Sequence, residues 1–282
     1  MISGASRERR LVLVHAHPDD EALATGGTIA RYSSEGAHVC LVTCTNGELG
    51  EVAEVPELGT VDEIQSRLGE VRTQELLDAC GILGDVDLRM LGYHDSGMDG
   101  TPANNEPHVF MNQDLDEVVQ RVVKILEEVR PQVVITYNEF GAYGHPDHIR
   151  AHEVALRAVA DAQHEVSKVY YTAFPRSLVE MARELWDQIG EGNPDEFMDE
   201  EEIQRVTTPD DQITTAIDAS KWIDQKFAAL EAHRTQRGTT DWILKIPPEF
   251  RVMGFGTEHY VLALGRRPGD GAREADLFEG VT

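Results

Sequence analysis

The chain has few cysteines and no long apolar run, and both absences narrow what it can be. Its three cysteines, Cys40, Cys44 and Cys80, have no CxxC spacing, which argues against a disulfide framework or a cysteine-ligated zinc site. We expect them to be small core residues. No apolar stretch approaches the roughly 20 residues that a bilayer requires. Residues 1–10 also lack the apolar segment of a secretory signal, so we expect a cytoplasmic protein.

Basic residues are also scarce relative to acidic ones. Lysine and arginine total 25 against 51 aspartates and glutamates, for a net charge of -26. Such a field repels phosphate groups and argues against nucleic acid or an anionic membrane as a partner. We interpret the acid as a solubility feature. The composition does not address oligomeric state, and a homo-oligomer stays open.

Short apolar runs alternate with helical patterns over the first two thirds of the chain. The predicted strands are residues 11–16, 38–44, 87–91, 132–137 and 168–173. The predicted helices are residues 21–34, 62–83, 114–129 and 149–162. Continuous apolar strands are typical of a parallel sheet covered on both faces. This order predicts an α/β fold with a Rossmann-like, doubly wound, mostly parallel sheet.

The pattern weakens after residue 174, so we divide the chain there. We expect residues 1–174 to form the catalytic core and 175–265 a smaller C-terminal α/β extension, in the same domain and bordering the cleft. Within the extension the sequence predicts helices at 177–189 and 219–233, an acidic loop at 190–211 and a strand at 259–264. Residues 266–282 are expected to form a flexible tail.

Chemistry in such folds gathers beyond the carboxyl ends of the strands, and a His-Pro-Asp-Asp segment follows the first strand. His17 and Asp20 are ligand types for zinc, which in catalytic sites has three protein ligands and a water. Asp19 is then free to act as a general base. The alternative for either aspartate is a helix cap that accepts backbone amide hydrogen bonds.

A second His-Pro-Asp segment follows the fourth strand, at residues 145–147, with His148 next to it. Two histidines with an aspartate between them can supply a ligand, a general acid and an orienting carboxylate. Two such turns at equivalent places in one sheet rarely arise by chance. Together they favour a metal-dependent active site over two structural caps. His152, one helical turn later, could support the site, but a surface position is favoured.

The two segments, at residues 16–21 and 144–148, resemble the signature motifs of the PIG-L/LmbE family of zinc-dependent N-acetylglucosamine deacetylases. Residues 43–51 and 95–101 are similar to the mycothiol-pathway branch of that family. This branch contains the deacetylase of N-acetylglucosaminyl-inositol and the mycothiol-conjugate amidase. The Asp-Ser-Gly-Met segment at residues 95–98 favours the deacetylase.

The resemblance implies a role for each candidate residue. The implied metal ligands, for Zn2+ or alternatively Fe2+, are His17, Asp20 and His148. The implied catalytic residues are Asp19 as general base, His145 as a protonated group assisting the intermediate and the leaving amine, Asp147 orienting His145, and Tyr143 polarising the carbonyl. The implied substrate-binding residues are Glu51, Arg72 and Asp95, which without the resemblance would be taken for surface groups.

The implied reaction is hydrolysis of an N-acetylglucosaminide amide by a metal-activated water, which releases acetate and a free amine. The nearest alternative is a mycothiol S-conjugate amidase or another N-acyl hydrolase of the family. A nucleotide-binding Rossmann module is disfavoured because the first strand leads into His-Pro-Asp-Asp, not a Gly-x-Gly-x-x-Gly turn. A metal-binding relative without catalysis is disfavoured because candidates for both base and acid are present.

Overall fold

The computed structural model describes residues 9–189, 199–269 and 271–281. In this part of the chain a seven-stranded sheet has the order β3-β2-β1-β4-β5-β7-β6. The strands are β1 (Arg10–His15), β2 (His38–Thr45), β3 (Val86–Tyr93), β4 (Val133–Thr136), β5 (Lys168–Ala173), β6 (Thr215–Asp218) and β7 (Thr257–Leu264). The first five are parallel, and β7 is antiparallel to its neighbours. Successive strands are added toward one edge of the sheet from β1 to β3 and toward the other edge from β4 on, which confirms the predicted doubly wound fold.

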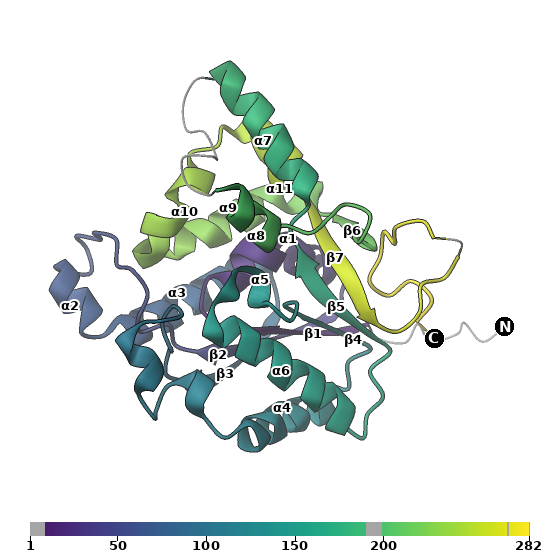
Figure 1. Cartoon of the computed structure of the whole chain (residues 1–282), viewed down its shortest axis with the longest axis horizontal. Coiled ribbons are helices and arrows are strands. Elements are labelled where there is room, and N and C mark those ends of the chain that lie inside the picture. The colour runs from purple at the N-terminus through teal and green to yellow at the C-terminus, as the bar shows by residue number, and fades with distance from the viewer. Residues whose placement is uncertain (1–8, 190–198, 270, 282) are drawn as a thin grey trace.

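Helices cover both faces of the sheet (Figure 1). The main ones are α4 (Leu115–Val129) and α6 (Pro146–Asp161) on one face, and α1 (Asp20–Ser34), α3 (Leu68–Leu83) and α9 (Ile223–Ala232) on the other. Strand β1 shows why both faces are apolar: Val12 and Val14 pack with the α4 and α6 side, while Leu11 and Leu13 pack with the other. Successive side chains of a strand point to opposite faces, so a central strand needs apolar residues at every position.

The structure corrects two of the predicted segments, one expected to be a helix and one expected to be a loop. The single helix predicted over 62–83 is broken into α2 (Val61–Gln65) and α3, because Arg67 leaves helical dihedrals at φ -136°, ψ 27°. The acidic loop predicted over 190–211 contains helix α8 (Glu200–Val206), which starts with a capping box between Asp199 and Glu202. Reciprocal capping of this kind stabilises a helix start despite the local acid. Residues 190–198 of that prediction lie outside the described residues.

The C-terminal extension continues the same sheet and adds short elements that the sequence pattern did not predict. Besides α7 (Arg176–Ile189), α9 and β7, it contains β6, α10 (Arg237–Leu244) and α11 (Pro248–Phe255). The prediction of a flexible tail over residues 266–282 is wrong for the segment that contains Leu277 and Phe278. Leu277 and Phe278 pack into the core with Tyr32 and Tyr260. Burial of their apolar surface holds the segment against the body of the protein.

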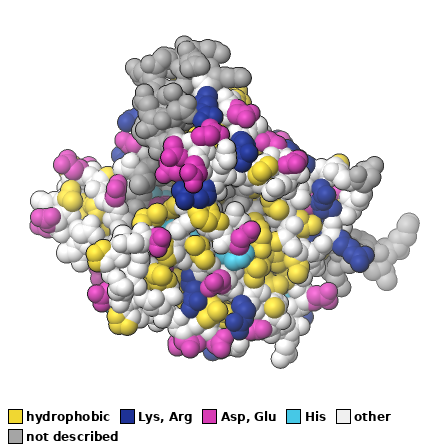
Figure 2. All heavy atoms as spheres, in the orientation of Figure 1, with side chains coloured by type: hydrophobic (Ala, Val, Ile, Leu, Met, Phe, Trp, Pro, Cys, Tyr) yellow, Lys and Arg dark blue, Asp and Glu magenta, His cyan; other side chains and the backbone are white. Residues whose placement is uncertain are grey.

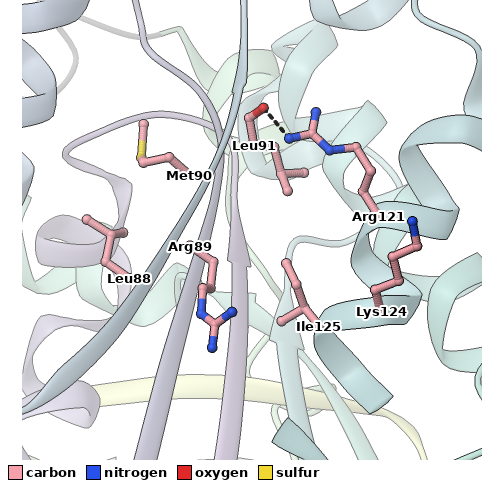
Figure 3. Close-up of a pocket in the computed structure, with 7 residues that line it drawn as sticks. All are labelled: Leu88, Arg89, Met90, Leu91, Arg121, Lys124 and Ile125. Atoms are coloured by element: carbon pink, nitrogen blue, oxygen red, sulfur yellow. Dashed lines mark hydrogen bonds between the residues drawn. The ribbon is translucent and has the colours of Figure 1, made fainter. Parts of the chain in front are cut away.

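Strand β3 forms one edge of the sheet, beside a hollow of about 440 Å³ between it and α4 (Figure 3). The Arg121 Nη2 donates to the Leu91 carbonyl (2.7 Å) across this hollow. Arg89 pairs with Asp87 and Glu128 at the same edge. Charged groups along an edge strand oppose pairing with another chain.

On the face shown in Figure 2, acidic side chains alternate with basic and apolar ones. Within the described ranges, no helix has the length and apolar character that a membrane span requires. The cysteines Cys40, Cys44 and Cys80 are free and buried, which confirms their expected core role.

Candidate active site

The two His-Pro-Asp turns meet where the winding of the sheet reverses. Strand β1 ends at His15 and leads through Pro18 into α1, and β4 leads through α5 (Gly141–Gly144) into α6. Helix α6 begins with His145 as its N-cap and Pro146 in its first turn. Proline is favoured there because its fixed φ suits a helix and no amide partner is lost. Because β1 and β4 are neighbours in the sheet, both turns lie at the crevice beyond the carboxyl ends of these two strands, as expected.

His17, Asp20 and His148 form a buried cluster of ligand atoms that all lie within 4.8 Å of one another. The Nδ1 atom of His17 lies 3.2 Å from Nε2 of His148, and that Nε2 lies 3.4 Å from Oδ1 of Asp20. Zinc ligands at about 2.0–2.1 Å in tetrahedral geometry are separated by about 3.3 Å. The spacing of these three residues therefore fits a zinc-sized ion, and their nitrogen and oxygen donors suit zinc or ferrous iron.

Asp20 is held in place by two donors to its Oδ2 atom. The backbone amide of His17 donates at 2.7 Å and the hydroxyl of Tyr137 at 2.8 Å. The Tyr137 oxygen in turn accepts from the Ala16 amide (2.9 Å) and contacts Nδ1 of His15 (3.0 Å). Burial and the Asp20 carboxylate raise the pKa of Tyr137, so its hydroxyl stays protonated and can donate. This arrangement leaves Oδ1 of Asp20 for an ion.

His17 is surrounded by carboxylates on its other side. Its Nε2 lies 3.2 Å from Oδ2 of Asp147 and 3.8 Å from Oδ1 of Asp95. Although burial lowers it, Asp95, Asp147 and Asp20 together raise the pKa of His17 to about 9. The pocket thus favours positive charge. A carboxylate on the far nitrogen of a ligand histidine fixes its tautomer and raises its basicity.

The carboxylate of Asp147 has other hydrogen-bond partners than the one we expected. We expected its carboxylate to orient His145, yet its hydrogen bonds run to His17 and to the backbone amide of Ser96 (2.9 Å). It is instead the backbone amide of Asp147 that donates to Nδ1 of His145 (3.1 Å), because His145 caps helix α6. With Nδ1 accepting, a neutral His145 carries its proton on Nε2.

His145 differs from expectation in charge as well. Burial and the positive charge at His17 lower the pKa of His145 to about 4. The lowered pKa and the accepting Nδ1 atom favour the neutral imidazole, whereas we expected a protonated group. Tyr143 stands above the cluster with 45% of its surface exposed, and its hydroxyl lies 3.4 Å from Nε2 of His148.

Asp19 sits beside the cluster in a strained conformation. Its φ of 123° lies in a region that side-chain-bearing residues rarely adopt, at a cost of about 1–3 kcal/mol. Its Oδ2 lies 3.1 Å from Nη2 of Arg72. Burial raises the pKa of Asp19 to about 6, against the lowering effect of Arg72. A carboxyl with a pKa in this range is suited to proton transfer near neutral pH.

The sequence of the chain is similar to one protein family and to named relatives. Residues 12–159 match the PIG-L family, described as GlcNAc-PI de-N-acetylase. The chain is 46% identical to a 1D-myo-inositol 2-acetamido-2-deoxy-alpha-D-glucopyranoside deacetylase of Acidothermus cellulolyticus, in an alignment that covers 97% of this chain and 95% of that protein. The chain belongs to the PIG-L family.

Solved structures with the same fold include deacetylases and an enzyme of a different name. An N,N'-diacetylchitobiose deacetylase from Pyrococcus horikoshii superposes with a TM-score of 0.60 at 18% identity, covering 91% of this chain and 84% of that one. A 4-carboxy-2-hydroxymuconate hydratase from Pseudomonas putida superposes with a TM-score of 0.61 at 18% identity, covering 93% and 99%. At this identity the likeness shows the fold alone, and a fold by itself does not determine the reaction.

The three expected substrate residues lie in different surroundings. Arg72 is only 3% exposed, and its guanidinium donates to the carbonyls of Gly47 (2.8 Å) and Pro18 (2.5 Å) besides contacting Asp19. A side chain at Gly47, where φ is +68°, would collide with that guanidinium. In this PIG-L family member Arg72 therefore joins the loop that contains Gly47 to the turn that contains Pro18. A contact between Arg72 and the substrate stays a prediction.

Asp95 and Glu51 differ from each other in burial. Asp95 is 3% exposed and accepts from the Gly97 amide (2.8 Å), which places its carboxylate at the floor of the site near His17. Glu51 is exposed on the loop that follows β2. Of the two, Glu51 has the freer access to a large substrate.

Several supporting residues of the site were missed in the sequence. Tyr137 is the last residue of the predicted strand 132–137, and that position at the active edge is the one signal that could have pointed to it. His152 is buried, and its Nδ1 contacts the Tyr137 carbonyl (2.9 Å), which supports the site and corrects the favoured surface position. Ser96, whose amide binds Asp147, has no local signal of its own.

Proposed function

We propose that this protein is a metal-dependent N-deacetylase that cleaves the acetamide of N-acetylglucosaminyl-inositol or a closely similar glycoside. The observation that carries the proposal is the buried His17, Asp20 and His148 cluster with the carboxylate of Asp19 beside it. The deacetylase name of a relative that is 46% identical over nearly the whole chain supports the substrate.

The residues of the chain divide the work of amide hydrolysis. Held by His17, Asp20 and His148, a zinc or ferrous ion would supply Lewis acidity to the acetamide carbonyl and lower the pKa of a water molecule. Asp19 takes the proton of the attacking water. Asp147 holds the tautomer of His17, and Tyr137 holds the orientation of Asp20.

The remaining groups stabilise the negative charge that develops on the carbonyl oxygen. The Nε2–H of neutral His145 and the hydroxyl of Tyr143 are the donors available above the cluster, and preorganised donors of this kind are a large term in catalysis. Asp19, which has taken the proton of the attacking water, passes that proton to the leaving amine. Acetate and the free amine are the products.

The experiment is a comparison of three substrates with the zinc-loaded protein. N-acetylglucosaminyl-inositol, free N-acetylglucosamine and a mycothiol-type S-conjugate are assayed side by side for free-amine release. We expect the inositol glycoside to react fastest, since a site built to bind hydroxyls can reject an analogue that lacks them by up to ~10⁴-fold. Faster turnover of the conjugate would assign the protein as an amidase. Equal rates on all three would contradict a specific aglycone pocket.

A pair of matched variants tests whether Glu51 contacts the substrate. Glu51 and Glu57 are both exposed in the segment that follows β2. We expect Glu51→Gln to lower kcat/KM for the glycoside more than for free N-acetylglucosamine, while Glu57→Gln leaves both unchanged. Asp95→Ala should lower kcat/KM with the metal retained. The same loss for both substrates in Glu51→Gln would show that Glu51 does not bind the aglycone.

A further inference from the structure

The strained Asp19 main chain is held by a buried side chain from its own helix. The Asp19 amide donates to Oε2 of Glu21 at 2.9 Å. The carbonyl of Asp19 accepts from the amides of Ala22 and Leu23. These bonds fix both sides of the residue whose φ is +123°. A conformation of this kind persists only when its surroundings determine it.

Glu21 is in turn held by a histidine that lies more than 200 residues further along the chain. Nε2 of His233 lies 2.6 Å from Oε1 of Glu21, and neither side chain is exposed to solvent. Although burial lowers it, the Glu21 carboxylate raises the pKa of His233 above its ordinary value. The two groups thus form a buried hydrogen-bonded pair, in which each satisfies a polar atom of the other.

His233 is itself rigidly placed by the turn that follows α9. Two residues on, the amide and hydroxyl of Thr235 donate to the carboxylate of Glu75 (2.9 and 2.6 Å). Glu75 lies in α3, three residues from Arg72, the residue that contacts the Asp19 carboxylate. The Thr235 carbonyl accepts from Ala53, in the loop after β2. One turn of the C-terminal extension therefore contacts Glu21, helix α3 and the loop that follows β2.

We infer that His233, acting through Glu21, is a positioning residue that keeps the Asp19 main chain in its left-handed conformation and so aims the Asp19 carboxylate at the attacking water. The inference rests on the proposed function for the role of Asp19 as the base. The chain of contacts has only two steps, from imidazole to carboxylate to amide, and each step is a hydrogen bond under 3 Å. A misplacement of about 1 Å at a catalytic group can cost up to 10²-fold in rate.

The chain contains a matched control on the same helix. Lys226 of α9 and Glu258 form a second buried pair (2.6 Å), and Glu258 accepts from the amides of Gly27 and Thr28 in α1. Both pairs therefore join α9, or the residue that caps its end, to backbone amides in α1 or at its start. Only the His233 pair reaches Asp19. Removing Lys226 should disturb the packing of these helices without moving the base.

The experiment compares His233→Ala, His233→Gln, Glu21→Gln and Lys226→Met in the zinc-loaded full chain. The readouts are kcat, KM, metal content and thermal unfolding. Glutamine can donate to Glu21 from its amide, so His233→Gln tests rescue by a conservative change. A readout without turnover is amide hydrogen exchange in a peptide that contains Asp19.

We expect His233→Ala to lower kcat by about 10- to 100-fold with KM and metal content unchanged. His233→Gln should recover most of that loss, and Lys226→Met should keep kcat while lowering the unfolding temperature. The Asp19 peptide should exchange faster in His233→Ala and Glu21→Gln than in Lys226→Met. In an Asp19→Ala background, His233→Ala should cause no further loss of kcat, because residues acting as one unit are not additive.

Wild-type kcat in a folded, metal-loaded His233→Ala or Glu21→Gln variant would overturn the inference. So would a His233→Ala loss that multiplies with that of Asp19→Ala, or an equal loss in Lys226→Met. If His233→Ala does not fold, His233→Gln and Glu21→Gln carry the test. If the wild-type protein deacetylates none of the glycosides, the proposed function fails, and hydrogen exchange at Asp19 still decides whether His233 holds the turn.

Discussion

Tyr137→Phe should weaken metal binding although Tyr137 itself is not a ligand. The substitution removes the hydroxyl that donates to Oδ2 of Asp20 and accepts from the Ala16 amide. It keeps the aromatic ring that stacks on His148, with ring centroids 4.2 Å apart. Asp20 then retains only the His17 amide on that oxygen, so its carboxylate can turn away from the cluster.

The size of the effect follows from these contacts. Loss of a partner that orients a metal ligand costs about 10- to 100-fold in metal affinity. The buried Ala16 amide, left without its partner, should cost a further 1–3 kcal/mol of folding stability, by the order-of-magnitude penalty for an unsatisfied group. Activity should return when enough metal is added, because the base and the oxyanion donors remain in place.

The assay is a chelator competition that measures the Kd for zinc, together with thermal unfolding of the metal-free protein. Tyr170→Phe is the matched control, since Tyr170 is equally buried and its hydroxyl donates to Glu274 (2.9 Å), outside the site. Both variants should lose stability, and only Tyr137→Phe should lose metal affinity. An unchanged zinc Kd in Tyr137→Phe would refute the reasoning that this hydroxyl orients Asp20.

Three further outcomes are expected. Asp20→Ala or His148→Ala should lose most of the bound metal, since a three-ligand site rarely survives the loss of one ligand; full occupancy by elemental analysis would contradict the ligand assignment. Asp19→Asn should keep its metal and lose ~10²-fold or more in kcat, the scale of general-base catalysis, whereas loss of metal in step with activity would make Asp19 a ligand. His145→Ala should lower kcat by about 10²-fold. Because the lowered pKa leaves His145 neutral well below pH 7, the alkaline limb of the pH profile should stay the same in that variant, and its disappearance would show that His145 titrates there.

The sheet and the two turns could be predicted because their signals are local. A buried parallel strand needs apolar residues at every position, and a His-Pro-Asp turn directly after it has to lie at the carboxyl edge. His17 and His148 are 131 residues apart, yet each is placed by its own strand. The topology then brings them together without any further signal from the sequence.

The supporting contacts could not be predicted in this way, because they depend on how distant elements pack. Nothing in the sequence near His233 indicates a partnership with Glu21, and the roles of Asp147 depend on the orientation of one side chain. The same limit applies to the C-terminal extension. Its strand β6 has four residues, too few for a periodic pattern, and the packing of Leu277 depends on a pocket made by other elements.

The charge of the site explains why these supporting contacts are needed. Four aspartates converge at its centre: Asp19, Asp20, Asp95 and Asp147. Buried carboxylates are costly unless they are paired or coordinate a metal, and the neighbouring cations are Arg72 and protonated His17. Repulsion among the four would drive the turns apart if the backbone were free to move. Hydrogen bonds of Asp20 with Tyr137, of Asp147 with the Ser96 amide and of the Asp19 amide with the Glu21–His233 pair oppose that movement. The fold therefore holds negative charge where a divalent cation can balance it, and binding of that cation adds to the stability of the folded state.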